Sequence, residues 1–161
     1  MICSLMYGTK QRIKELRLGI IMEAKIRYHE AHKIHFAKEY PNAFRSGHYT
    51  APAWLKVATA NGLTNYIINF VNWSGYRATR ISTTGRKIGD KWIKGTTRRG
   101  TADISLTIRG KSIMIEVKVG SDKPSEHQLK EQAKERAAGG WYEFVSSPEE
   151  FLEIYDRIVS L

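Results

Sequence analysis

The stretch RRGTADISLTIRGKSIMIEVKVG, residues 98–120, has the pattern of two β-strands joined by a tight turn. Apolar and polar side chains alternate on both sides of the turn, as they do in strands with one buried face. Gly110-Lys111 suits a two-residue type II′ turn, because glycine is favoured at its first central position. With this turn, Arg109 would lie opposite Ser112, and that pair predicts the register of the whole hairpin.

Four polar side chains share one face of the predicted hairpin. In this register Asp103 lies opposite Lys118, and Ser105 lies opposite Glu116. The opposite face is apolar and consists of Ile104, Leu106, Ile108, Ile113, Ile115, Val117 and Val119. Diagonal neighbours in such a pair lie about 7–8 Å apart at the backbone, so two carboxylates can reach one small cation. We therefore expect Asp103, Glu116 and Lys118 to meet.

These three side chains have the chemistry of a metal-dependent hydrolase. Mg²⁺ takes carboxylate, carbonyl and water oxygens, so Asp103 and Glu116 would supply two ligands and the Val117 carbonyl a third. Lys118 would orient or deprotonate a water, or stabilise charge on a phosphate. The hairpin alone leaves an alternative open, in which Asp103 and Lys118 form a cross-strand ion pair and Glu116 lies on a solvated face.

The rest of the chain predicts an α/β or α+β domain behind a helical extension. We expect residues 1–61 to be a basic, partly helical extension and residues 62–161 to be a domain with a mixed sheet. The expected order in that domain is α-β-β-β-α-β-α. Its elements are a helix over 63–74, a strand over 76–82, a long loop over 83–100, the hairpin, a helix over 126–138, a strand over 141–147 and a helix from 148. In the extension we expect a loose or partly helical lead, a helix over 22–40 that stops at Pro41, and an irregular connection over 41–61.

Positive charge is concentrated in the first hundred residues, which hold eighteen Lys and Arg against five Asp and Glu. The remaining residues hold eight against eleven. A basic surface beside a nearly neutral body favours a polyanion, and nucleic acid in particular. The densest part runs directly into Asp103, and its predicted phosphate contacts are Arg86, Lys87, Lys91, Lys94, Arg98 and Arg99. The alternative is a solvated basic loop without a defined role.

Composition argues against a disulfide-stabilised protein and against a membrane-spanning protein. The single cysteine, Cys3, forbids an internal disulfide, and no apolar run reaches the roughly 18 residues that a membrane span needs. We therefore expect a cytoplasmic protein without a membrane partner.

The separated motifs together resemble a known nuclease superfamily. Asp103, then IEVK at 115–118, then SEHQ ending at Gln128 are similar to the PD-(D/E)XK pattern. More closely, the chain over about residues 62–158 resembles the VRR-NUC group of small phage and bacterial nucleases, relatives of Holliday junction resolvases. The resemblance implies a restriction-endonuclease-like core, dependence on Mg²⁺ or Mn²⁺, DNA as substrate and a homodimer. It also implies an active-site set of Asp103, Glu116, Lys118 and Gln128.

The chain departs from that family in two places. Ala102 stands where a proline usually precedes the first acid, and the first core helix has no acid. Asn61, Asn65 or Asn69 would have to replace that acid through water, which leaves the number of metals open. Gln128 also has a structural interpretation, since Ser125-x-x-Gln128 is a capping box, and we expect its side chain to serve only one of the two roles.

Three functions follow in order of preference. The first is a metal-dependent endonuclease that cuts branched or otherwise structured DNA. The second is a non-catalytic DNA-binding module on a nuclease-like scaffold, and the third is a nuclease directed at RNA.

Overall fold

The computed structural model describes residues 2–81, 86–93 and 98–161, with side chains at residue 19 and in 21–81, 89–90 and 98–161. The chain divides into two compact units, residues 1–54 and 55–161. Each unit is described by itself below.

The first unit is built on a long helix. Helix α1 (Ile2–Glu39) ends just before Pro41, as predicted, and a short helix α2 (Pro41–Arg45) follows. The lead, expected to be loose or partly helical, is helical, because α1 already begins at Ile2. The expectation of an irregular connection is wrong in part, because Pro41 starts a helix. Proline suits the first turn of a helix, where its missing N–H has no partner to lose. Phe36, Phe44 and Tyr49 pack their rings against one another.

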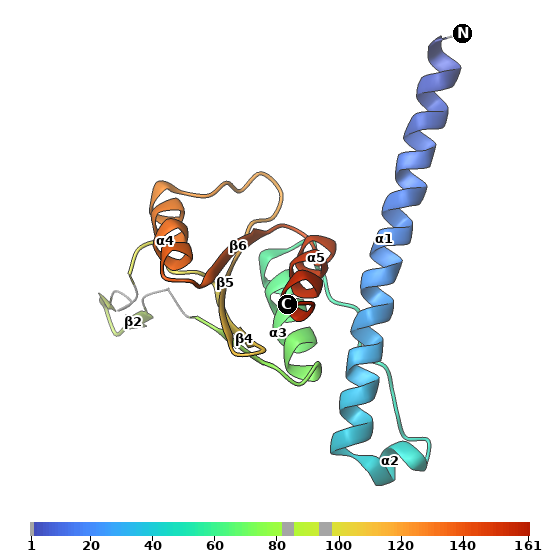
Figure 1. Cartoon of the computed structure of the whole chain (residues 1–161), viewed down its shortest axis with the longest axis horizontal. Coiled ribbons are helices and arrows are strands. Elements are labelled where there is room, and N and C mark those ends of the chain that lie inside the picture. Colours follow the sequence, from blue (N-terminus) through green and yellow to red (C-terminus); the bar gives the residue numbers. More distant parts are fainter. Residues whose placement is uncertain (1, 82–85, 94–97) are drawn as a thin grey trace. The chain divides into compact units, whose positions relative to one another are not determined.

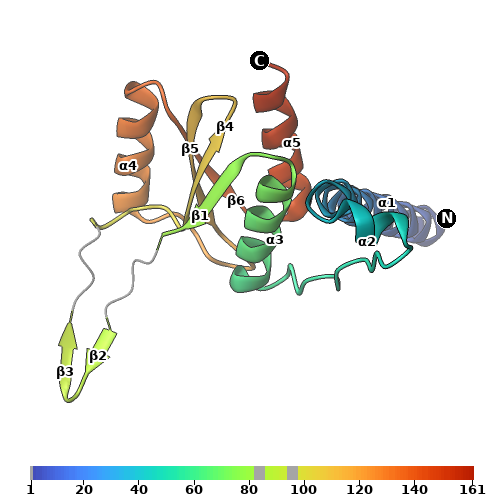
Figure 2. The ribbon, with the colours of Figure 1, turned by 90° about the horizontal axis from the view of Figure 1, so that it is seen from below.

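The second unit has the predicted order of elements, with one additional short hairpin between the first predicted strand and the predicted hairpin. Its helices are α3 (Ala60–Trp73), α4 (Glu126–Ala137) and α5 (Pro148–Val159), and its main strands are β1 (Arg77–Arg80), β4 (Ile104–Ile108), β5 (Lys111–Val117) and β6 (Trp141–Val145). The sheet order is β1-β4-β5-β6, with β6 parallel to β5 and the other pairs antiparallel (Figure 1). Helices α3 and α5 cover one face of this sheet and α4 the other (Figure 2). The unit is therefore an α+β fold with a mixed sheet.

The core lies between the sheet and the helices α3 and α5. The apolar face predicted for the hairpin is buried from Ile104 to Val117, although Val119 is only half-buried. Phe70 of α3 packs its ring edge-on against Phe151 and Tyr155 of α5. Burial of such rings contributes more than any polar contact in the unit, at about 25 cal/mol for each Å² removed from water.

The register of the hairpin differs from the prediction by two residues. Ile108 pairs with Lys111, so the turn is Arg109-Gly110, and Ser112 lies opposite Thr107. Both turn residues have positive φ, +50° and +76°, which type I′ requires. The Arg109 guanidinium donates to the Val159 carbonyl at the end of α5, which helps to hold this unusual backbone for a non-glycine residue. A shift of two residues preserves both faces, because side chains alternate with a period of two.

A second, short hairpin lies where the sequence predicts only a long loop. Strands β2 (Arg86–Ile88) and β3 (Lys91–Ile93) pair antiparallel around Gly89 and Asp90. The three-residue strands are too short for a period-two pattern to stand out, and the many Lys, Arg, Gly and Thr residues over 83–100 favoured a loop.

Side chains occupy backbone groups at both edges of the four-stranded sheet. At the β1 edge, the Asn72 carboxamide accepts from the Ala78 N–H at 2.8 Å and donates to the Ala78 carbonyl at 3.3 Å. At the β6 edge, Gln132 and Arg136 both donate to the Tyr142 carbonyl. These contacts block part of each edge against pairing with another strand.

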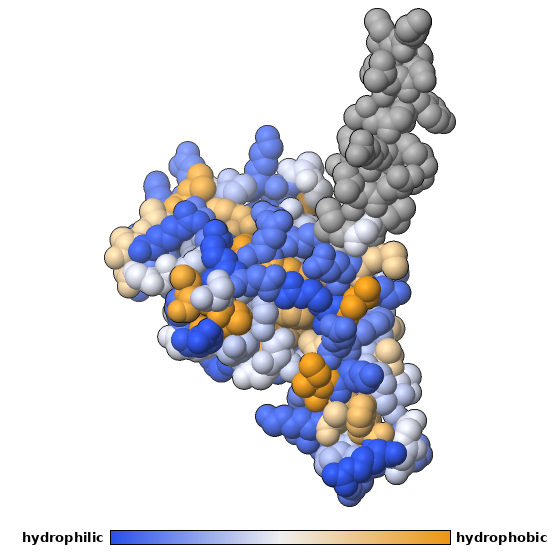
Figure 3. Space-filling model, turned by 45° about the vertical axis from the view of Figure 1, so that its right-hand side comes forward, coloured by the Kyte–Doolittle hydropathy of each residue, from blue (hydrophilic) through white to orange (hydrophobic). Residues whose placement is uncertain are grey.

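Figure 3 shows a face on which hydrophobic residues are scattered among hydrophilic ones. Within the described ranges, no helix combines the length and the apolar composition that crossing a membrane requires.

Candidate active site

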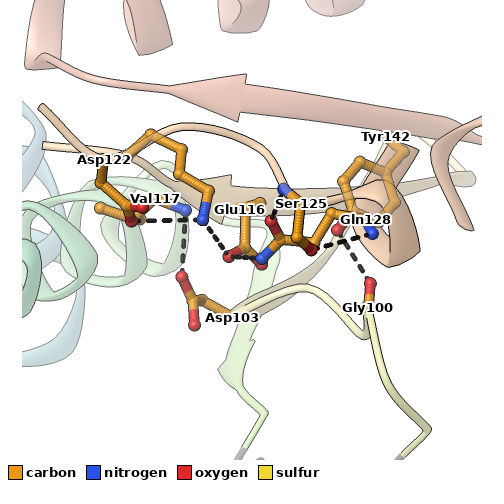
Figure 4. A network of polar contacts seen from close by, with 9 residues as sticks. Gly100, Asp103, Glu116, Val117, Asp122, Ser125, Gln128 and Tyr142 are labelled. Atoms are coloured by element: carbon orange, nitrogen blue, oxygen red, sulfur yellow. Dashed lines mark hydrogen bonds and ion pairs between the residues drawn. The ribbon is translucent and has the colours of Figure 1, made fainter. Parts of the chain in front are cut away.

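Asp103 lies in a bend just before β4 and joins two neighbouring strands. Its backbone carbonyl accepts from the Ile81 N–H at 2.7 Å, and its side-chain Oδ2 accepts from the Val117 N–H at 3.0 Å. The side chain thus binds an N–H at the end of the β4–β5 ladder. This bond fixes the Asp103 carboxyl next to the end of β5, beside Glu116 (Figure 4).

Glu116 is a buried acid, with 5% of its surface exposed. Its Oε1 accepts from the Gln128 carboxamide and from Lys118, whose Nζ lies 3.2 Å away. Its Oε2 is buried and has no hydrogen-bond partner among the described residues. Burial raises the pKa of Glu116 to about 6, the nearby Asp103 carboxylate contributes to the rise, and Lys118 opposes it. Oε2 of Glu116 is therefore buried, and none of the described residues forms a hydrogen bond to it.

Gln128 forms the predicted cap and also contacts an acid of the candidate site. Its Oε1 accepts from the Ser125 N–H at 2.8 Å, which completes the predicted capping box at the start of α4. Its Nε2 donates to Glu116 at the same time. The cap is therefore confirmed and does not prevent the contact with Glu116, because the two ends of a carboxamide are an acceptor and a donor, while the active-site role of Gln128 stays a prediction.

Lys118 lies between two carboxylates. Its Nζ is 3.2 Å from Glu116 and 3.2 Å from Oδ2 of Asp122, a residue for which the sequence predicted no role. The expected placement of Lys118 opposite Asp103 is wrong, because β5 is shifted relative to β4. Burial lowers the pKa of Lys118, but its hydrogen bonds to Glu116 and Asp122 outweigh that effect and raise the pKa overall. The amine is thus held in its charged form.

These contacts contradict the plain ion-pair interpretation of the hairpin. That interpretation places Glu116 on a solvated face, whereas Glu116 is almost completely buried. The partners of the Lys118 amine in the described structure are Glu116 and Asp122 rather than Asp103.

A glycine and a tyrosine hold the segment that leads into Asp103. Gly100 has a φ of +85°, and a Cβ at this position would come within 2.5 Å of the His127 carbonyl oxygen. The chain can therefore pass close to the first turn of α4 only with glycine here. The buried Tyr142 hydroxyl donates to the Gly100 carbonyl at 3.0 Å. Burial, with the nearby Glu116 and Asp103 carboxylates, raises the pKa of that hydroxyl, so it remains a donor.

The residues present fit a hard divalent cation held by few protein ligands. Within the described ranges, no group of three or more His, Cys, Asp or Glu side chains is placed to hold a metal ion. Mg²⁺ keeps several waters and is commonly bound through one or two carboxylates, which Asp103 and Glu116 can provide. A cation would also satisfy the orphaned Oε2 of Glu116, since a buried charged oxygen without a partner costs free energy. The Val117 carbonyl stays a predicted third ligand.

The predicted basic residues are described only in part. Arg98 and Arg99 are exposed, and Arg98 is close enough to α4 to help Lys134 lower the pKa of Glu131. At Arg86, Lys87 and Lys91 the structure describes the backbone, in β2 and β3, and Lys94 lies outside the described residues. Among the asparagines of α3, Asn61 accepts from Arg80 at 2.7 Å.

Three contributors to the site were missed by sequence reasoning. Asp122 follows Lys118 by four residues in a turn, and a second carboxylate so close to a lysine was the available signal. For Gly100 the available signal was its position in the sequence, between two arginines and the bend that contains Asp103. Tyr142 had none, because nothing in the pattern of a short strand indicates which distant carbonyl a tyrosine will bind.

Comparison of the chain with family models, curated proteins and solved structures gives no match in any of the three.

Proposed function

We propose that the protein is a divalent-metal-dependent nuclease that hydrolyses phosphodiester bonds in branched or otherwise structured DNA. The observation that carries this proposal is the buried Glu116 carboxyl, whose Oε2 has no partner among the described residues and which lies next to Asp103. A purely structural site has no need to hold a half-buried acid, Asp103, next to a buried one, Glu116. The motif order that resembles the PD-(D/E)XK nucleases supports the same chemistry.

In this proposal Asp103 and Glu116 hold Mg²⁺ or Mn²⁺, with the Val117 carbonyl as a further ligand. When bound, the ion lowers the pKa of water and offsets negative charge on the phosphate. Gln128 fixes the orientation of Glu116 through its Nε2 and does not need to touch the substrate. The Lys118 ammonium has a third N–H beyond those directed at Glu116 and Asp122, and it donates this to a phosphate oxygen or to the attacking water.

DNA is the preferred substrate because of the basic first hundred residues and the exposed Arg98 and Arg99, which precede Asp103 by five and four residues in the chain. Arginine and lysine side chains bind phosphates without regard to base sequence, so they position the strand rather than select it. Cleavage within the host cytoplasm and a homodimer remain expectations from the resemblance. If the chain does pair with itself, the blocked edges of the four-stranded sheet disfavour continuation of the sheet across the dimer.

A cleavage assay tests the proposal. Linear, flapped and four-way DNA, supercoiled plasmid and matched RNA are incubated with Mg²⁺ or Mn²⁺, with a chelator as control. We expect cleavage by the wild type, and none by Asp103→Asn or Lys118→Ala although both still bind DNA. Lys111→Ala is the matched control, since Lys111 lies at the opposite end of β5 and should cut normally. Cleavage at the wild-type rate by Asp103→Asn or Lys118→Ala would reject the assignment.

One observation favours the non-catalytic alternative, a DNA-binding module on a nuclease-like scaffold. Among the described residues no third acid is placed with Asp103 and Glu116 to hold a metal ion, and α3 supplies none. This alternative predicts salt-sensitive DNA binding and no cutting with any divalent ion.

A further inference from the structure

Asp122 belongs to the loop that joins β5 to α4, and its side chain returns toward the site. Its Oδ2 lies 3.2 Å from Lys118 Nζ. The same Nζ lies 3.2 Å from Oε1 of Glu116 (Figure 4). The loop is fixed at its start, where the Lys118 N–H donates to the Val145 carbonyl at 2.8 Å. It is fixed at its end by the capping box of Ser125 and Gln128.

We propose that Asp122 is a positioning residue that holds the Lys118 amine over the active site. A lysine side chain has four flexible methylene groups, and fixing it in one place costs conformational entropy. Two acceptors from different segments restrict the amine to one place, and they leave its third N–H for the substrate. This role rests on the nuclease function proposed above.

The role becomes more important when the site is loaded. A cation held by Glu116 draws on the same carboxylate that pairs with Lys118, so that contact weakens. Asp122 is then the partner that keeps the amine in place. Asp122 is 55% exposed, and ion pairs at the surface contribute little to stability. We therefore expect its removal to affect turnover much more than folding.

The test compares Asp122→Ala, Asp122→Asn and Asp122→Glu with the wild type. We expect Asp122→Ala to lower kcat roughly tenfold with little change in KM or in the unfolding midpoint, since misplacing a catalytic group slows the chemical step. Asp122→Asn should recover part of the loss, because its carboxamide oxygen still accepts from the amine. Asp122→Glu should recover more. Glu153→Gln, an exposed acid on α5, is the control for loss of one negative charge and should leave kcat unchanged.

A second readout does not depend on cleavage. The side-chain ammonium signal of Lys118 in ¹H–¹⁵N NMR spectra, identified by its absence in Lys118→Ala, should be detectable in the wild type and lost in Asp122→Ala. An unchanged signal in Asp122→Ala, or an unchanged kcat, overturns the positioning role. If the wild type cuts no nucleic acid, the nuclease proposal fails separately, and the Lys118 signal alone decides whether Asp122 holds the amine.

Discussion

Replacement of Gln128 by glutamate separates its capping role from its role at the active site. Glutamate at this position still completes a capping box with Ser125, so the start of α4 is preserved. It cannot donate to Glu116, and it places a second carboxylate against a buried one. Gln128→Glu therefore changes the site and leaves the cap intact.

The loss of stability expected for Gln128→Glu depends on pH. A hydrogen bond to a charged group contributes about 1.5–3 kcal/mol, and repulsion between two carboxylates about 4 Å apart adds at most about 4 kcal/mol at an effective dielectric constant near 20. Proton uptake relieves part of this repulsion. We expect a loss in the free energy of unfolding of about 3 kcal/mol at pH 8. At pH 5 the loss should be less than half as large, because Glu116, with a pKa of about 6, is then protonated and can donate to the new carboxylate.

Urea unfolding followed by circular dichroism, with a chelator present, measures both values. Gln132→Glu is the matched control, because Gln132 lies one turn further along α4 and donates to the Tyr142 carbonyl instead of to an acid. Its loss should be the same at pH 5 and pH 8. Equal losses at the two pH values for Gln128→Glu, or full wild-type stability at pH 8, would refute the proposed contact between Gln128 and Glu116.

Three further predictions concern the site and its surroundings. The folded-state pKa of Glu116 is raised from 4.5 to about 6, so the stability that this residue contributes is present below pH 4.5 and is lost as the pH rises through 6. In urea unfolding the wild type should therefore lose about 2 kcal/mol relative to Glu116→Gln between pH 4 and pH 7. Gly100→Ala should destabilise the protein more than Gly139→Ala, by about 1 kcal/mol or more, and should slow cleavage. The two glycines have similar φ, +85° and +86°, but only at Gly100 would a Cβ meet backbone, so equal thermal shifts would argue against the close packing. Arg99→Ala should weaken DNA binding uniformly across sequences and reduce the salt slope by about one, whereas an unchanged slope in fluorescence anisotropy would place Arg99 away from phosphate.

The order of the elements could be predicted from the sequence because each has a strong local signal. The helical spacing of Leu63, Tyr66, Ile67 and Phe70, and the capping serines at 125 and 147, all mark elements that the structure contains. The buried face of the hairpin followed from alternation alone. Alternation does not distinguish registers that differ by two residues, so the turn at Arg109-Gly110 was missed. Arg109 of this turn donates to the Val159 carbonyl in the last turn of α5, a contact across about fifty residues of chain that no local pattern indicates.

The candidate site was predictable as a set of residues but not as a geometry. Asp103, Glu116, Lys118 and Gln128 lie together or are linked by contacts, whereas the predicted pairing of Lys118 with Asp103 was wrong. Burial of Glu116 could not be read from the hairpin, because it depends on α4 covering that face of the sheet. The contribution of Asp122 depends on the path of a loop, which no periodic pattern specifies.

Binding of Mn²⁺ to the protein in the absence of DNA, measured by electron paramagnetic resonance of the free ion, tests the metal site most directly. The proposed metal site requires that the wild type binds Mn²⁺. Asp103→Asn and Glu116→Gln should each weaken this binding by at least about tenfold, and Glu153→Gln should leave it unchanged. Equal Mn²⁺ binding by the wild type and both site variants would contradict the proposed metal site.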